Sequence, residues 1–77
     1  MKLAGQRFRS KATYQLGRIT KTSQSHIWIS FNKTSDDSLK LTFDDFLKYC
    51  YSNEEVEQEV RDRIEKQREI QPNKDNG

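Results

Sequence analysis

The stretch HIWISFN, residues 26–32, is the most concentrated run of β-branched and aromatic residues in this chain of 77. Ile27, Ile29 and Phe31 occupy every second position, and turn-forming residues bound the run at both ends. Strict alternation of this kind is typical of a β-strand with one face in the core. We therefore predict that residues 26–32 form the central strand of a sheet, with these three side chains facing inward.

The opposite face of this strand presents His26 and Trp28, the only histidine and the only tryptophan of the chain. Tryptophan is highly buried on average, so a helix that follows the sheet can cover Trp28 and make it part of the core. An uncovered Trp28 would instead be a contact residue beside His26. The sequence leaves both possibilities open.

Three further strands are expected around this one. Alternation from Phe8 to Leu16 predicts a strand whose second face carries Arg7, Arg9 and Lys11, and Gly17 then predicts a bulge or tight bend. Residues 17–22 read as a second strand with Arg18 outward and Lys21 in register with Ile19, followed by a short hairpin connection. After a polar turn at residues 33–38, the alternation of Leu39, Leu41 and Phe43 predicts a fourth strand.

Two helices are expected to follow. Thr42 and Asp45 form a capping signal for a short helix over 43–51, whose apolar stripe includes Phe46 and Cys50. Ser52 and Glu55 offer a second capping box for a helix over 53–70. Three acid-to-base pairs at i and i+4 support the second helix: Glu57 with Arg61, Glu59 with Arg63, and Asp62 with Lys66.

These elements predict an α+β fold: a small antiparallel β-sheet or open SH3-like barrel of about four strands, followed by a short and a longer C-terminal helix. A chain of this length makes a single domain, which we place at residues 1–70. Residues 71–77 contain no packing side chain and the only proline, so a disordered tail is expected there.

Charge is divided between the two halves of the chain. Residues 1–35 contain seven basic residues and no acid, whereas residues 36–77 contain all 12 acids and seven bases. The net charge of +2 therefore hides a basic first half that can attract a polyanion. The alternative is that these cations only solvate an outer sheet face.

Enzymatic readings lack the necessary residues. One cysteine, Cys50, and one histidine supply too few ligands for a closed zinc site, and Cys50 falls on an apolar stripe rather than beside a base. The chain has no glycine-rich phosphate loop, no apolar signal sequence and no membrane-length apolar segment. We expect a non-enzymatic, cytoplasmic protein without cofactor, metal, membrane association or small-molecule substrate.

Binding of nucleic acid is the first functional hypothesis. A curved basic sheet with exposed aromatic residues combines phosphate neutralisation with base stacking. The residues assigned to such a site, or to an acidic partner surface, are Arg7, Arg9, Lys11, Arg18, Lys21, His26 and Trp28. Trp28 is the stacking candidate, and the others except His26 would contact phosphates.

The second hypothesis is a protein-binding inhibitor, adaptor or accessory subunit, including an inhibitor that a virus encodes against a host machine. The apolar stripe of the second helix is narrow and consists of Val56, Val60 and Ile64. Under this hypothesis that stripe docks on a partner or on a second copy of the chain, and the basic sheet covers an acidic protein surface.

Overall fold

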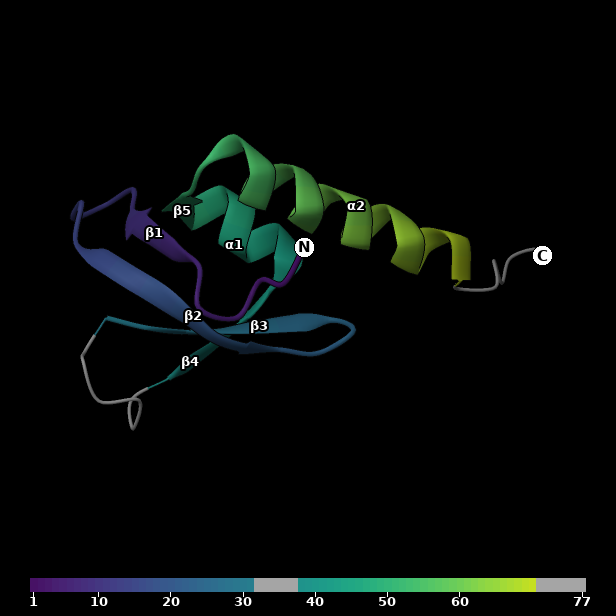
Figure 1. Ribbon diagram of the computed structural model, residues 1–77, viewed down its shortest axis with the longest axis horizontal. Helices are drawn as coiled ribbons and strands as arrows, with labels where there is room; N and C mark the ends of the chain where they lie inside the picture. The colour runs from purple at the N-terminus through teal and green to yellow at the C-terminus, as the bar shows by residue number, and fades with distance from the viewer. Residues whose placement is uncertain (32–37, 71–77) are drawn as a thin grey trace.

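The chain folds as an α+β domain in which two helices follow an antiparallel sheet (Figure 1). The structure is a computed structural model that describes residues 1–31 and 38–70, so the expected tail at 71–77 and most of the expected turn at 33–38 lie outside the described residues. The elements in chain order are β1 (Arg7–Ser10), β2 (Leu16–Thr22), β3 (His26–Ser30), β4 (Leu39–Thr42), α1 (Phe43–Tyr49), β5 (Cys50–Tyr51) and α2 (Glu54–Ile70).

The strands form one half-barrel sheet in the order β4-β3-β2-β1-β5, with every neighbouring pair antiparallel. The predicted fold class is thus confirmed, with β3 inside the sheet between β2 and β4. The hairpin predicted between β2 and β3 is also present, because the Ser23 amide donates to the His26 carbonyl at 2.9 Å. Ser23 Oγ then accepts from the amides of Ser25 and His26, which fixes the turn.

The core lies between the sheet and the helices. Both helices lie on the same side of β2, β3 and β4 in Figure 1. Ile27 and Ile29 are buried as predicted, and Phe31 packs against the same cluster. The remaining buried apolar side chains come from the N-terminal segment, β1, β2, α1, β5 and α2: Leu3, Phe8, Ile19, Phe43, Phe46, Cys50, Val56 and Val60. Burying one large apolar side chain contributes about 1.5–3 kcal/mol, so this small cluster accounts for the stability of a short chain.

The first strand is shorter than its alternation predicts. β1 ends at Ser10, and the next residues turn, with the Tyr14 amide donating to the Ser10 carbonyl at 2.8 Å. The predicted bulge at Gly17 is wrong, since Gly17 lies inside β2 opposite Phe8. A Cβ atom there would stand 2.7 Å from Phe8 Cζ and 3.0 Å from the Ser30 carbonyl oxygen, so the close approach of these groups, rather than a bend, requires glycine.

The helix predicted over 43–51 ends two residues early. Cys50 and Tyr51 are extended and pair with Ser10 and Arg9, forming a fifth strand that the sequence reading missed. The short segment carried the apolar spacing of a helix, but its backbone completes the edge of the sheet beside β1. Cys50 is nevertheless buried, as its position on an apolar stripe suggested.

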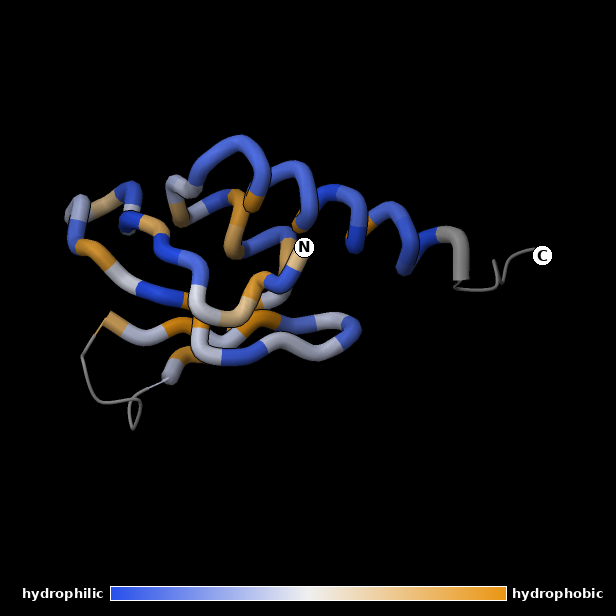
Figure 2. Tube along the Cα trace, viewed as in Figure 1, coloured by the Kyte–Doolittle hydropathy of each residue, from blue (hydrophilic) through white to orange (hydrophobic). Residues whose placement is uncertain are grey.

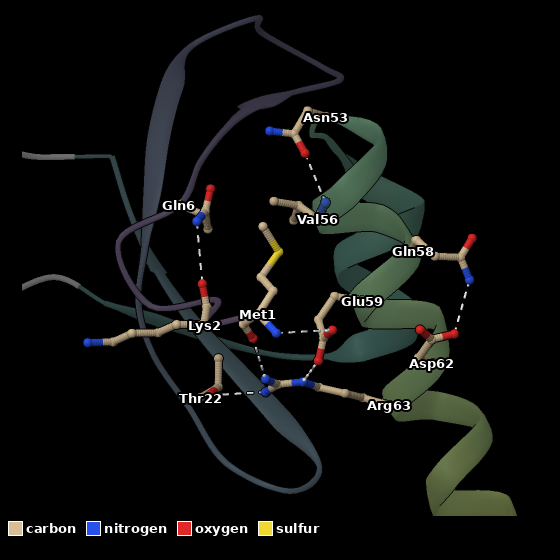
Figure 3. A network of polar contacts seen from close by, with 10 residues as sticks. All are labelled: Met1, Lys2, Gln6, Thr22, Asn53, Val56, Gln58, Glu59, Asp62 and Arg63. Carbon is tan, nitrogen blue, oxygen red and sulfur yellow. Dashed lines mark hydrogen bonds and ion pairs between the residues drawn. The ribbon is translucent and has the colours of Figure 1, made fainter.

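The two helix starts have different outcomes. Thr42 caps α1 as predicted, since its Oγ1 accepts from the Asp45 amide at 3.1 Å. At α2 the predicted Ser52 cap is wrong. Asn53 Oδ1 accepts from the Val56 amide at 2.9 Å (Figure 3). Ser52 Oγ, in contrast, is buried and has no hydrogen-bond partner among the described residues.

The helix α2 is largely hydrophilic, with a few hydrophobic positions that face the sheet (Figure 2). Val56 and Val60 are fully buried in the core of the same chain, and Ile64 packs against its border. The assignment of Val56 and Val60 to a partner surface is therefore corrected, because the chain's own core occupies them, whereas Ile64 is only half-buried.

Ion pairs and hydrogen bonds tie α2 to the rest of the fold (Figure 3). Glu59 receives the Arg63 guanidinium at 2.8 Å and the N-terminal ammonium at 3.7 Å, and Arg63 also donates to the Met1 carbonyl at 3.2 Å. The predicted pair between Arg61 and Glu57 forms at 3.6 Å. The predicted pair between Asp62 and Lys66 does not form within the described part of the chain. Asp62 Oδ1 instead accepts from the side-chain amide of Gln58.

Candidate functional site: the outer face of the sheet

The sheet face that lies away from the helices carries most of the basic residues of the first half of the chain. Strand register places these side chains in rows, because residues directly opposite one another point to the same side of a sheet. We call this surface the outer face. Its residues stand in four rows across the strands: His26 and Thr42; Lys21, Trp28 and Lys40; Arg7, Arg18 and Ser30; and Arg9, Leu16 and Tyr51.

Trp28 lies in the middle of one such row. Its Cα is level with Lys21 on β2 and with Lys40 on β4, and the two ammonium groups stand 4.6 Å and 5.5 Å from the centroid of the indole ring. Trp28 is half-buried and is not part of the core, which takes Ile27 and Ile29 from the alternate positions. The helix α2 therefore does not cover Trp28, and the indole faces outward between two cations.

A β-bulge explains why Lys21 belongs to this row. The register between β2 and β3 shifts between Ile19 and Lys21, and Thr20 Oγ1 donates to the Trp28 carbonyl oxygen at 3.2 Å. An extra residue in one strand reverses the alternation beyond it. Lys21 thus faces outward although Ile19, two residues earlier, is fully buried. The expectation that Lys21 follows Ile19 is wrong for this reason.

Three arginines continue the outer face toward β5. Arg7 and Arg18 stand directly opposite each other, an arrangement that is unfavourable for like charges unless anions or solvent screen them. Arg9 is level with Leu16 and Tyr51, and its Nη1 donates to the Tyr14 carbonyl oxygen at 2.8 Å. Ser30, beside Arg18, is buried, so the exposed part of these rows lies on the side of β1.

Lys11 was expected to continue the face of Arg7 and Arg9, and this expectation is wrong. β1 ends before it, and Lys11 Nζ donates to the Leu47 carbonyl oxygen at 3.1 Å, at the last turn of α1. Its backbone amide donates to the Tyr49 carbonyl oxygen at 2.9 Å. Lys11 thereby holds the β1–β2 turn against α1, while its ammonium group stands 5.3 Å from the Tyr51 ring.

His26 lies beside Trp28, with 6.4 Å between the two ring centroids. Its Nδ1 is 2.7 Å from Ser25 Oγ, which orients the half-buried imidazole at the end of the hairpin. This contact therefore fixes the orientation of the His26 ring beside Trp28.

The groups that catalysis would need do not meet. Cys50 pairs with Ser10 on the core side, whereas His26 lies on the outer face. Burial raises the pKa of the Cys50 thiol to about 11, although the charge of Lys11 opposes this shift, and a protonated thiol is a poor nucleophile. No cluster of three or more histidine, cysteine, aspartate or glutamate side chains in residues 1–31 and 38–70 could hold a metal ion.

The sequence reading missed three exposed residues of this surface. Lys40 could have been found, because it alternates with Leu39 and Leu41 in the predicted fourth strand. Tyr51 and Tyr14 are 48% and 62% exposed, and their rings meet edge to face at a centroid distance of 5.9 Å. Both had been placed in longer elements, a helix and a strand, that end before them.

Comparison of the chain with known protein families, with curated proteins and with solved structures returns no match. Among the helices that the structure describes, neither is long and apolar enough to cross a membrane.

Proposed function

We propose that this protein is a non-enzymatic binding protein whose outer face binds single-stranded nucleic acid. The observation that carries the proposal is the row in which two lysines flank the outward-facing indole of Trp28. Stacking of a base on an aromatic ring contributes about 1–3 kcal/mol, and adjacent cations neutralise the phosphates of the same strand.

The charges around Trp28 support the same proposal. No carboxylate among the described residues pairs with Arg7, Arg9, Lys21 or Lys40, since the described ion pairs all involve α2. A solvated surface commonly mixes both signs of charge, whereas the described residues of this face carry only positive charge, together with aromatic rings. Such a surface is complementary to a polyanion that also has flat apolar groups.

A single strand fits better than a duplex. The bases of a duplex are stacked on one another and paired, whereas those of a single strand are free to stack on aromatic side chains. Trp28 lies within β3 between two neighbouring strands, and not at the tip of a loop from which it could insert between the base pairs of a duplex. We therefore expect affinity for a labelled 12-nucleotide dT strand to exceed that for a duplex of the same length.

The primary test is a fluorescence-anisotropy titration of the dT strand at several salt concentrations. The outer face offers five cations, Arg7, Arg9, Arg18, Lys21 and Lys40, and each phosphate contact on a single strand contributes about −0.7 to the slope of log K against log salt concentration. The expected slope is about −3.5 if all five take part. Absence of binding even at low salt would overturn the proposal.

Two variants separate stacking from charge. Trp28→Ala should weaken binding of the strand about 10-fold or more while leaving the salt slope unchanged, because it removes a stacking surface and no charge. Lys21→Gln should lower the slope by about 0.7. Arg68→Gln is the matched control, because it makes the same charge change on an exposed position of α2, and it should alter neither quantity.

An acidic protein surface is the alternative partner, which an inhibitor or adaptor would engage through the same cations. It would not require Trp28 to stack. Equal affinity for poly-glutamate and for the dT strand, with equal losses in Trp28→Ala, would favour this alternative over nucleic acid. A cytoplasmic setting, in which nucleic acid is accessible and a lone thiol stays reduced, completes the proposal.

A further inference from the structure

The exposed tyrosines at the β5 edge form a second aromatic cluster on the outer face. Tyr51 comes from β5 and Tyr14 from the β1–β2 turn, and their rings are nearly perpendicular, with an interplanar angle of 85°. Lys11 Nζ lies over the Tyr51 ring and Arg9 Nη1 binds the Tyr14 backbone. The cluster thus repeats the combination found at Trp28, an outward-facing ring beside cations, toward the opposite edge of the same face.

The backbone of the turn displays Tyr14 at a cost. Tyr14 has a φ of 64°, in the left-handed region that residues with a side chain rarely adopt. Three hydrogen bonds hold this conformation, from the Tyr14 amide to the Ser10 carbonyl, from Arg9 to the Tyr14 carbonyl and from the Ser10 amide to the Gln15 carbonyl. The result is a tyrosine side chain that is 62% exposed and contributes nothing to the core. A costly conformation that exposes an aromatic ring is a feature typical of binding sites.

Strand register connects the two clusters. Tyr51 is level with Arg9, and Trp28 is level with Lys21, so the line from one ring to the other crosses β1 and β2. Arg7 and Arg18 stand opposite each other between these rows. Three strand spacings and about four residue steps separate the rings, which corresponds to a diagonal of about 20 Å on a flat sheet.

We propose that Tyr51, supported by Tyr14, is a second base-stacking site, and that one strand runs diagonally across the outer face from Trp28 to Tyr51. This inference rests on the proposed function and adds a path and a length to it. The phosphates between the two rings would pass Arg18, Arg7 and Arg9. At a rise of 3.4 Å per stacked nucleotide, a strand that reaches both rings takes about six steps and so has about seven nucleotides.

Length dependence is the first test. Anisotropy titrations with labelled dT strands of 3, 6, 9 and 12 nucleotides should show a steep rise in affinity between 3 and 9 nucleotides, larger than the rise expected from additional binding registers alone. A rise that is absent in Tyr51→Ala, but retained in wild type, supports the path. Affinity that increases equally in both proteins overturns it.

The second test compares exposed tyrosines. Tyr51→Ala should weaken binding of the 12-nucleotide strand about 10-fold with an unchanged salt slope, because one stacking contact is lost and no charge is removed. Tyr49→Ala is the matched control. Tyr49 is 54% exposed, but it belongs to α1 and is not part of any row of the outer face. Equal losses in the two variants would overturn the assignment to Tyr51. Thermal unfolding should confirm that both variants fold.

A direct readout does not depend on any variant. Ring protons of Tyr51 should shift upfield on addition of the 12-nucleotide strand, because a stacked base imposes a ring current, and should stay in place with inorganic phosphate. If Trp28→Ala weakens binding but Tyr51→Ala has no effect and the Tyr51 signals do not shift, the proposed function stands and the second stacking site is overturned. No binding by wild type would overturn the proposed function itself.

Discussion

The two faces of the sheet use the same strands for opposite purposes. On the inner face, Ile19, Ile27 and Ile29 lie under both helices and are 3% exposed or less. On the outer face, the residues between them present cations and aromatic rings that no described element covers. The inner face therefore supplies the stability of the fold. The outer face adds little to the core, and we propose that it binds the ligand.

The largest expected effect follows from breaking the inner face. Phe46→Ala removes a fully buried ring that meets Phe8 edge to face at 5.4 Å, and should lower the free energy of unfolding by about 3–5 kcal/mol. Trp28→Ala on the outer face should cost no more than about 2 kcal/mol, because the indole is half-buried and its main contacts are exposed lysines. Denaturant unfolding followed by circular dichroism measures both.

Equal losses in these two variants would contradict the division of roles between the faces. If Phe46→Ala does not fold at all, Phe46→Leu provides the comparison, with an expected cost of about 1–1.5 kcal/mol. The loss of stability should then still be larger at Phe46 than at Trp28 when Trp28→Phe replaces Trp28→Ala.

Gly17 is a point on the inner face where an added Cβ atom would meet the neighbouring strands, at the Phe8 ring and the Ser30 carbonyl. Gly17→Ala should lower the free energy of unfolding by about 1–3 kcal/mol, since its Cβ would overlap the Phe8 ring and the Ser30 carbonyl. Gly5→Ala is the matched control. Gly5 has open space around it but a φ of 93°, so its cost of about 1 kcal/mol is purely conformational. A Gly17→Ala protein as stable as wild type would show that the sheet yields at this position.

The sequence predicted the inner face well, because burial imposes a period of two that is visible in the residues themselves. Ile27, Ile29 and Phe31 face the core as expected, and Thr42 caps α1. The fold class followed from these signals. The outer face was predicted only in part: Trp28 and the arginines belong to it, whereas Lys11 does not.

Besides the early end of β1 at Ser10, which removes Lys11 from this face, the errors on the outer face have two physical causes. A bulge at Thr20 reverses the alternation, and no residue type in β2 announces it. Pairing of Cys50 and Tyr51 with β1 overrode the apolar spacing that favoured a longer helix, because the edge of the sheet supplies hydrogen bonds that local sequence does not encode. Both events depend on neighbouring strands, so a single stretch of sequence could not reveal them.

Substitutions at the start of α2 should have a smaller effect on the free energy of unfolding. They bear on the inner face because this helix supplies Val56 and Val60 to the core. Asn53→Ala should cost about 1 kcal/mol, because it removes the hydrogen bond to the Val56 amide. Ser52→Ala should be neutral or slightly stabilising, because its buried hydroxyl has no partner among the described residues. Thermal unfolding of both variants measures the difference, and the reverse order would restore Ser52 as the cap.

The smallest effect concerns Glu59, which joins α2 to the N-terminus. The hydrogen bond from Arg63, assisted by the N-terminal charge, lowers the pKa of Glu59 from its ordinary value of 4.5. A carboxyl group whose pKa is lower in the folded state stabilises the fold above its unfolded pKa, and this contribution is lost as the pH falls through the folded pKa. The melting temperature of wild type should therefore exceed that of Glu59→Gln at pH 6, and the two should converge below pH 4. Because the Glu59 side chain is partly exposed and solvent screens its ion pairs, we expect a difference of only a few degrees at pH 6. A constant difference between pH 6 and pH 3 would mean that shape rather than charge matters at Glu59.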